Sequence, residues 1–182
     1  MNNDLGDDIK LSFNHFLIKI TSMALLHTPE VNTTWEVNKI HSYKSTDIGI
    51  AVAIDNGLIT PIIRSVEKKG LLEIRDETSD LITRAREKKL LPSEYQGGTI
   101  SISNLGSYGI KSFTSIINPP QSSILSIGAS RKVPVVLDDA VNIDEVISIT
   151  LTADHRLIDG AVGAKFIAYM KQLIENPNLM LL

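Results

Sequence analysis

The 182-residue sequence contains no cysteine, and this absence removes several kinds of chemistry at once. Disulfide frameworks, thiolate nucleophiles and cysteine-based zinc sites all need a thiol that the chain does not have. The sequence also lacks an H-E-x-x-H segment or a comparable cluster of ligands, so we expect no bound metal. Any catalysis must therefore use other side chains.

Long apolar runs and an excess of positive charge are missing as well. No stretch reaches the roughly 18 apolar residues that a membrane helix needs. Met1 to Lys10 form an acidic, polar segment without the apolar core of a secretion signal. The net charge of −3 gives no electrostatic reason to expect nucleic acid or an anionic membrane as partner. We expect neither partner, and a cytoplasmic or mitochondrial-matrix location.

The composition is that of an ordinary globular protein. Hydrophobic residues make up 43% of the chain and charged residues 21%, which is typical of a folded domain. A chain of this length can bury a substantial core as a single unit. Since the sequence shows no internal repeat or linker, we expect one domain over residues 1–182.

Three segments carry apolar residues at helical spacing. The first begins at Phe13, after Ser12 as a plausible cap, and ends before Pro29. The second runs from Leu71 to Lys89, and the third from Gly160 until Asn176-Pro177 ends it. Each has one apolar face, so we expect each to cover part of a sheet.

Extended segments outnumber these helices about two to one. Asp47–Ile54 and Leu58–Arg64 flank the turn signal Asp55-Asn56-Gly57, and could form a hairpin. Further strands are expected at Thr99–Asn104 and Ser122–Gly128, at two short pieces around Asp138-Asp139, and at 147–152, where apolar and polar residues alternate. The pattern predicts an α+β, or mixed α/β, fold with helices covering a sheet.

The segment from Asp154 to Gly160 is the sharpest candidate for chemistry. His155 stands between the alternating strand and the last helix, and a neutral imidazole can accept a proton near physiological pH. Asp159 precedes the helix and could stabilise its first turn. On its own, the segment does not separate a catalytic histidine from a structural one. His15, His27 and His41 stand in helical or polar surroundings that favour structural or solvated roles.

A second candidate lies at the end of the 99–104 strand. Ser103 and Asn104 carry a hydroxyl and an amide beside a glycine-containing loop, and such groups can donate a hydrogen bond to an oxyanion. The same residues could equally face solvent or cap the turn. The loop from Gly106 to Ser112 does not have the spacing of a phosphate-binding loop.

Five further landmarks follow one another along the chain at Asp55–Arg64, Tyr95–Thr99, Ser103–Gly106, Ile117–Gln121 and Asp154–Gly160. Together these segments resemble the catalytic domain of the dihydrolipoamide acyltransferases of 2-oxoacid dehydrogenase complexes, a family related to chloramphenicol acetyltransferase. Within the family, Gly109–Phe113 and Glu175–Leu182 look most similar to the acetyltransferases of pyruvate dehydrogenase. The resemblance implies the chloramphenicol acetyltransferase-like fold.

The resemblance also implies roles for individual residues. His155 corresponds to the catalytic base that deprotonates the thiol of coenzyme A or dihydrolipoamide. Ser103 corresponds to the hydroxyl that stabilises the tetrahedral oxyanion, and Asp159 to the structural carboxylate of the motif. We also expect Asn104 to contact substrate. Because family members form trimers with sites between subunits, His155 and Ser103 should come from different chains.

The family implies larger partners too. Its trimers assemble into cubic or dodecahedral cores, in which an apolar C-terminal end, here Met180, Leu181 and Leu182, docks onto a neighbour. The lipoyl group is carried on a separate domain, and the E1 and E3 components complete the complex. We expect residues 1–182 to be the catalytic core alone, without the family's N-terminal segment, lipoyl domain and subunit-binding domain. The open alternatives are a non-catalytic core or assembly fragment, branched-chain or succinyl specificity, and a small-molecule acetyltransferase.

Overall fold

The computed structural model describes residues 10–55, 57–137 and 139–181. Three α-helices and eleven strands make up the regular structure of this part of the chain, with short 3₁₀ turns between them. The helices are α1 (Phe13–His27), α2 (Leu71–Arg86) and α3 (Gly160–Glu175). The strands are β1 (Thr33–Glu36), β2 (Lys39–Ser42), β3 (Ile48–Ile50), β4 (Val52–Ile54), β5 (Gly57–Ile59), β6 (Ile62–Ile63), β7 (Ile100–Asn104), β8 (Ser123–Ile127), β9 (Arg131–Leu137), β10 (Ala140–Val146) and β11 (Ile149–Ala153).

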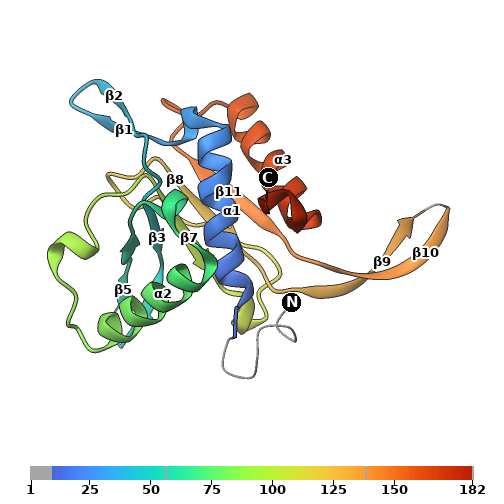
Figure 1. The fold of residues 1–182 in the computed structure, drawn as a ribbon. Coiled ribbons are helices and arrows are strands. Elements are labelled where there is room, and N and C mark those ends of the chain that lie inside the picture. Colours follow the sequence, from blue (N-terminus) through green and yellow to red (C-terminus); the bar gives the residue numbers. More distant parts are fainter. Residues whose placement is uncertain (1–9, 56, 138, 182) are drawn as a thin grey trace.

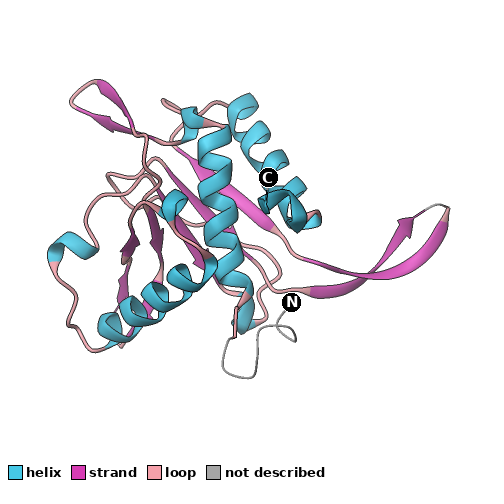
Figure 2. Cartoon of the chain, viewed as in Figure 1, coloured by secondary structure: helices cyan, strands magenta, loops and turns pink. Residues whose placement is uncertain are grey.

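A five-stranded mixed sheet, in the order β11-β8-β7-β3-β6, forms the centre of the molecule. Strands β3, β7 and β8 run parallel to one another, while β11 and β6 are antiparallel to their neighbours. Helices α1 and α3 lie side by side in front of this sheet in the view of Figures 1 and 2. The predicted mixed α/β architecture with helices covering a sheet is confirmed.

The two faces of the sheet differ in character. Alternation along the strands turns Ile100, Ile102 and Leu125 toward the helices, where they are buried in one core with Phe166 of α3. The opposite face carries hydroxyl side chains, namely Ser101 and Ser103 of β7, Ser126 of β8, and Thr150 and Thr152 of β11. The polar face predicted for the 147–152 segment is therefore one end of a wider row of serines and threonines.

The region from 47 to 64 departs from the simple hairpin expected there. Strand β3 pairs with β6 inside the main sheet, while β4 and β5 form a separate two-stranded ribbon, so each predicted strand is divided in two. The pairing across the turn is antiparallel, as a hairpin requires, and Asn56 at the turn lies outside the described residues. The predicted antiparallel pair is present, but its two halves belong to two different sheets.

Two further hairpins project from the body. Strands β9 and β10 form a long arm that reaches away from the sheet (Figure 1), in place of the two short pieces expected around Asp138-Asp139; Asp138 itself lies outside the described residues. Strands β1 and β2, which the sequence analysis did not predict, form a shorter hairpin. Helix α2 ends at Arg86, three residues before the expected end, because Lys88 adopts a left-handed backbone with φ of 59°.

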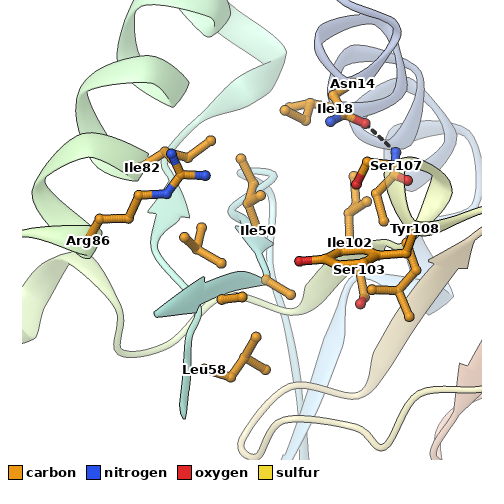
Figure 3. A pocket seen from close by; sticks show the side chains of 15 residues that line it. Asn14, Ile18, Ile50, Leu58, Ile82, Arg86, Ile102, Ser103, Ser107 and Tyr108 are labelled. Atoms are coloured by element: carbon orange, nitrogen blue, oxygen red, sulfur yellow. Dashed lines mark hydrogen bonds between the residues drawn. The ribbon is translucent and has the colours of Figure 1, made fainter. Parts of the chain in front are cut away.

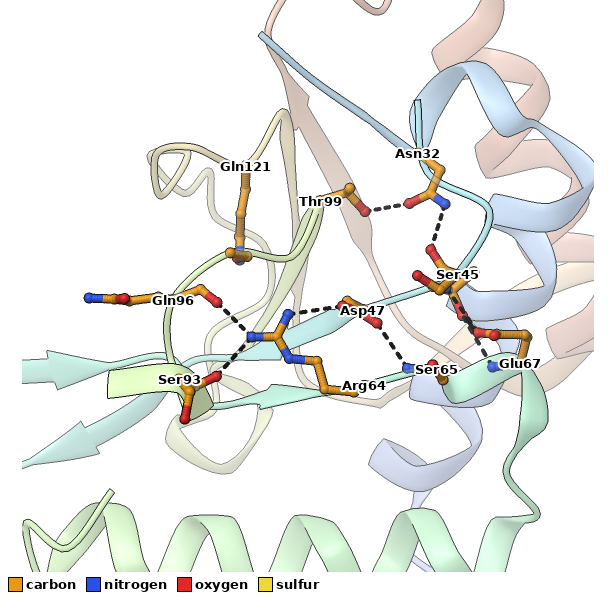
Figure 4. Close-up of polar contacts among 12 residues, drawn as sticks. Asn32, Ser45, Asp47, Arg64, Ser65, Glu67, Ser93, Gln96, Thr99 and Gln121 are labelled. Atoms are coloured by element: carbon orange, nitrogen blue, oxygen red, sulfur yellow. Dashed lines mark hydrogen bonds and ion pairs between the residues drawn. The ribbon is translucent and has the colours of Figure 1, made fainter. Parts of the chain in front are cut away.

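A polar cluster around Arg64 fixes the approach to β7 (Figure 4). The Arg64 guanidinium donates from Nη1 to Asp47 Oδ2 at 2.9 Å, and from Nη2 to the carbonyls of Ser93 and Gln96 at 2.9 and 2.6 Å. The Gln121 side chain donates to the carbonyl of Gly97 at 3.1 Å and accepts from Ser101. These bonds fix the backbone around Gly97 and Gly98, which lie just before β7, and so they set where that strand begins.

Candidate active site

His155 sits on a tight turn directly after β11. The backbone N–H of Asp154 donates to the Ser122 carbonyl at 2.8 Å, and the Asp154 carbonyl accepts from Leu157 and Ile158 at 3.0 Å each. Ile158 is buried in the core, while the His155 side chain is exposed. The turn therefore anchors both flanks of His155 and presents its imidazole outward.

Arg156 links this turn to the β1–β2 hairpin. Its Nη2 donates to Asp154 Oδ2 at 2.6 Å, and these hydrogen bonds hold the pKa of Asp154 below its ordinary value. The guanidinium carbon also lies 5.0 Å from the ring centroid of Trp35, within the range of a cation–π contact. The hairpin that the sequence did not predict thus touches the residue next to His155.

Asp159 caps the N-terminus of α3. Its Oδ1 accepts the backbone N–H of Val162 at 2.8 Å, and this bond holds the pKa of the Asp159 carboxyl below its ordinary value. The carboxylate therefore stabilises the first turn of the helix that follows His155. The geometry agrees with the architectural role that the sequence suggested.

Ser103 lies near the end of β7, on the hydroxyl-bearing face of the sheet. Its neighbours on that face have partners: Ser101 donates to Gln121, and the hydroxyls of Ser126 and Ser115 are 2.7 Å apart. The Ser103 hydroxyl has no hydrogen-bond partner among the residues that the structure describes. A half-buried hydroxyl without a protein acceptor can donate to a substrate oxygen.

Asn104, the other residue proposed for this end of β7, makes two hydrogen bonds within the chain through its side chain. Its Oδ1 accepts the backbone N–H of Gly106 at 2.7 Å, and its Nδ2 donates to Asn14 Oδ1 of α1 at 2.6 Å. One amide hydrogen of Asn104 is left for another acceptor. Asn104 therefore braces the turn after Ser103, and its contact with substrate stays a prediction.

A hollow of about 280 Å³ opens beside Ser103 (Figure 3). Strands β3, β4 and β7, helices α1 and α2, and the turn after β7 enclose it. Its described lining residues are Asn14, Ile18, Ile50, Ala51, Val52, Ala53, Leu58, Ile82, Arg86, Ile102, Ser103, Asn104, Leu105, Ser107 and Tyr108. Most of these are apolar, with amides and hydroxyls on the side of β7 and α1. The sequence analysis identified Ser103 and Asn104 but not the rest, because the hollow joins segments far apart in the chain.

Ser103 and His155 of one chain do not meet. The strand register places Ser103 beside Ser126, and Ser126 beside Thr150 on β11. His155 follows Thr150 by five positions, beyond the far end of β11. Strand β11 covers the first three of these positions, about 10 Å at roughly 3.3 Å per residue, and His155 lies on the turn beyond it. Two strand spacings of about 4.8 Å separate β11 from β7. Direct cooperation within one chain is excluded by this distance.

The remaining histidines make local contacts. His15 Nδ1 accepts the backbone N–H of Ser12 at 3.1 Å, and burial lowers the pKa of His15. His27 stacks on Tyr169 with ring centroids 3.8 Å apart, and His41 is exposed. Within the described ranges, no group of three or more histidine, aspartate or glutamate side chains is arranged to hold a metal ion. None of the helices in the same ranges is long and apolar enough to cross a membrane.

Comparisons with known proteins converge on one family. The model of the 2-oxoacid dehydrogenases acyltransferase (catalytic domain) matches residues 1–182. The chain is 49% identical to the dihydrolipoyllysine-residue acetyltransferase component of the pyruvate dehydrogenase complex of Rickettsia bellii, over 100% of this chain and 44% of that protein. It is 46% identical to the mitochondrial component of Neurospora crassa, over 100% of this chain and 41% of that protein. The chain thus spans less than half the length of these relatives.

Solved structures agree with the sequence relatives. The cubic core of the pyruvate dehydrogenase multienzyme complex matches with a TM-score of 0.92 at 32% identity, over 96% of this chain and 73% of that one. The same values hold for a dihydrolipoamide acetyltransferase from Azotobacter vinelandii, studied for the roles of a serine, a histidine and an asparagine in its catalytic mechanism. A chloramphenicol acetyltransferase matches with a TM-score of 0.57 at 18% identity, over 88% of this chain and 77% of that one, which shows a shared fold.

Proposed function

The chain belongs to the family of 2-oxoacid dehydrogenase acyltransferase catalytic domains, and on that premise we propose that it moves an acetyl group between coenzyme A and dihydrolipoamide. Its relatives at 46–49% identity are named as acetyltransferase components of pyruvate dehydrogenase complexes, which favours acetyl over branched-chain or succinyl groups. Residues 1–182 are proposed as the catalytic core, with the lipoyl group arriving on a separate domain. No observation favours the non-catalytic scaffold or the small-molecule acetyltransferase.

One observation carries the assignment of residues. In the Azotobacter enzyme, the studied serine precedes the histidine by 52 positions and the asparagine follows the histidine by four. In this chain, Ser103 precedes His155 by 52 positions and Asp159 follows it by four. The match supports Ser103 and His155 as the reacting pair. It also supports a role for Asp159 in the site, with a carboxylate where that enzyme has an amide.

The proposed mechanism is a general-base acyl transfer. The neutral imidazole of His155 takes the proton from the attacking thiol, and the resulting thiolate adds to the thioester carbonyl of the acetyl donor. The Ser103 hydroxyl donates a hydrogen bond to the oxyanion of the tetrahedral intermediate, a contact that contributes about 3 kcal/mol in comparable sites. When the intermediate collapses, the carbon–sulfur bond to the donor breaks. The departing thiolate then takes the proton back from the imidazolium.

We propose that this site forms between two copies of the chain in a homotrimer. If Ser103 and His155 act on the same substrate, a second copy must supply one of them, since neither residue can reach the other in its own chain. Helices α1 and α3 cover the other face of the sheet (Figure 2). On the hydroxyl-bearing face, Ser101 and Ser126 are buried within the chain, but Ser103, Thr150 and Thr152 are half-buried and offer a surface for that copy. His155, exposed on an anchored turn, is placed to enter the site of a neighbour.

The β9–β10 arm gives independent support for assembly. Val136, Val141 and Ile143 share one face of the arm and are 72%, 73% and 78% exposed. A contiguous apolar strip of this kind is characteristic of an interface. We propose that another copy covers it, and that trimers join into a cubic or dodecahedral core, as the cubic core among the structural relatives suggests. Met180 and Leu181 would contribute to contacts between trimers; the side chain of Leu181, and Leu182, lie outside the described residues.

The remaining partners and the location follow from the same family. Lipoyl domains would deliver dihydrolipoamide, and the E1 and E3 components would complete the reaction sequence. The named relatives include bacterial proteins and one labelled mitochondrial, so we propose the bacterial cytoplasm or the mitochondrial matrix. The absence of a metal requirement stays a prediction.

The experiment that tests the proposal measures acetyl transfer from acetyl-coenzyme A to dihydrolipoamide. We expect His155→Ala to lower the rate by roughly 10²- to 10⁴-fold, which is the usual contribution of a general base. Sedimentation of the variant should be unchanged, because His155 has no hydrogen bond to another residue that the structure describes. Wild-type turnover in the variant, or an assembled wild-type particle without transfer activity, would contradict the proposal.

A further inference from the structure

Arg86 is the one cationic side chain among the described residues that line the hollow beside Ser103. It extends from α2 toward Ile50, across the hollow from Ser107 and Tyr108 (Figure 3). No aspartate or glutamate belongs to the same lining. A hollow with one positive charge and no carboxylate favours a ligand that carries negative charge.

The Arg86 guanidinium has no partner in the described part of the chain, unlike the other arginines of α2. Arg75 pairs with Asp76 at 2.7 Å, and Arg84 pairs with both Asp80 and Glu94 at 2.7 Å. Asp55 shares a shallow neighbouring hollow with Arg86 but makes no ion pair with it. The planar guanidinium of Arg86 is therefore free to bind an anion with two parallel hydrogen bonds, the geometry that suits phosphate.

The rest of the lining suits a thin, mostly apolar chain. Ile18, Val52, Ile82 and Ile102 provide apolar walls, and Asn14 adds an amide. At about 280 Å³ the hollow is at the small end of ligand pockets, so it can hold an arm of a ligand rather than a whole nucleotide. A ligand with a slender amide-containing arm and phosphates at the other end fits both the walls and Arg86.

We infer that Arg86 binds a phosphate of coenzyme A at the mouth of this hollow, with the pantetheine arm lying along the apolar wall toward Ser103. The inference rests on the proposed function, which it deepens by assigning the hollow to one of the two thiol substrates. Dihydrolipoamide carries no phosphate, so it offers no anionic group for the unpaired guanidinium of Arg86 to bind. Ser103 lines the hollow and is half-buried on the hydroxyl-bearing face of the sheet, so a thiol that reaches it would meet the His155 of a neighbouring copy in the proposed trimer.

The test compares the binding of coenzyme A and of pantetheine to the assembled protein by calorimetry. We expect Arg86→Gln to weaken coenzyme A binding by roughly 10- to 100-fold, the range for a charge-assisted pair of hydrogen bonds. Pantetheine, which lacks the phosphates, should bind both proteins equally. Arg86→Lys keeps the charge without the planar fork and should lose less affinity than Arg86→Gln.

A matched control removes a neighbouring charge that does not line the hollow. Lys88 is exposed two positions beyond Arg86 and has a left-handed backbone that asparagine accepts, so Lys88→Asn should leave coenzyme A binding unchanged. In steady-state kinetics, Arg86→Gln should raise the KM for coenzyme A and leave the KM for dihydrolipoamide at its wild-type value.

The outcomes separate this inference from the proposed function. Equal coenzyme A binding by wild type and Arg86→Gln, or an equal loss of coenzyme A and pantetheine, would overturn the role of Arg86 and leave the acyl transfer standing. If wild type binds coenzyme A through Arg86 but transfers no acetyl group, the proposed reaction fails and the Arg86 site stands. A wild-type particle that binds no coenzyme A overturns both.

Discussion

Ser103 and His155 stand at opposite ends of the same mixed sheet: strand β8 lies between their strands β7 and β11, and His155 follows the level of Thr150 by five positions. Ser103 belongs to the end where β7 finishes, while His155 follows the end where β8 begins. No rotamer change of either side chain closes a gap of at least about 10 Å along the strands and two strand spacings across them. On the proposed function, each chain would therefore contribute its histidine to one site and its serine to another.

Mixing two inactive variants tests directly whether the His155 and Ser103 of one site come from different chains. In a trimer that contains both His155→Ala and Ser103→Ala chains, some interfaces combine an intact Ser103 from the first with an intact His155 from the second. With equal amounts and random assembly, about a quarter of the sites regain both groups, by the symmetry of a closed ring. The expected result is acetyl transfer near that fraction of wild type in unselected co-expressed particles, and about a third of wild type in trimers purified on both tags.

Chains that carry both substitutions provide the control for this mixing. Co-assembled with His155→Ala chains, they supply no intact His155, so no interface can recover. Activity that stays absent in the first mixture as well would place the two residues in one chain and contradict the shared site.

Asp159 should act through the helix that it caps. Asp159→Ala removes the acceptor for the Val162 N–H, and we expect the melting temperature to fall by roughly 2–4 °C. Asp159→Asn keeps a capping oxygen and should melt close to wild type. Acetyl-transfer assays of both variants then separate capping from charge: full activity in Asp159→Asn with reduced activity in Asp159→Ala supports an architectural role. A loss of activity in both, without a change in melting, would point to the carboxylate charge instead.

The apolar strip of the arm should control assembly. Ile143→Glu places a carboxylate in the middle of the strip, where a covering copy would have to bury it, and burying an unpaired charge is strongly unfavourable. We expect this variant to sediment as smaller species than wild type. The neighbouring Asn142→Glu points to the other face of the arm and serves as the control. An unchanged particle in the Ile143→Glu variant would show that the strip is not an interface.

The Arg84–Glu94 pair predicts a defined response to acid. The hydrogen bonds from Arg84 lower the pKa of Glu94 to about 2, from an ordinary value of 4.5. Because the folded pKa is the lower one, the pairing stabilises the fold fully above pH 4.5, and this stabilisation is lost as the pH falls toward 2. Glu94→Gln should therefore show a smaller fall in melting temperature over that window than wild type. Glu87→Gln, at an exposed pair with Lys89, should follow the wild-type curve.

Local patterns predicted the regular elements of the core well. The three helices begin where capping and apolar spacing placed them, at Phe13, Leu71 and Gly160, because each buries one continuous face. Strand β7 was predicted as well, and in the structure a buried isoleucine alternates with serine along it. The type of fold followed from the order of these elements, and its relation to a known family followed from five short motifs.

The β1–β2 hairpin shows where local patterns fail. All four residues of β2 are exposed, so no apolar alternation marks the strand. Its turn uses Val37 and Asn38, both with positive φ, and a β-branched valine is rare in that conformation. Arg86 was missed for a different reason. Its sequence context is that of a charged helix surface, and only the tertiary fold brings it to the same hollow as Ile50 and Ser103.

The exposed arm has a consequence for the chain during its synthesis. If another copy covers the arm, as we propose, then before assembly the apolar side chains and unpaired strand edges of β9 and β10 are open to pairing with unrelated chains. Subunits made in excess over their partners would be the first to aggregate or to be degraded. We therefore expect the steady-state amount of this protein to follow the rate at which nascent copies find one another.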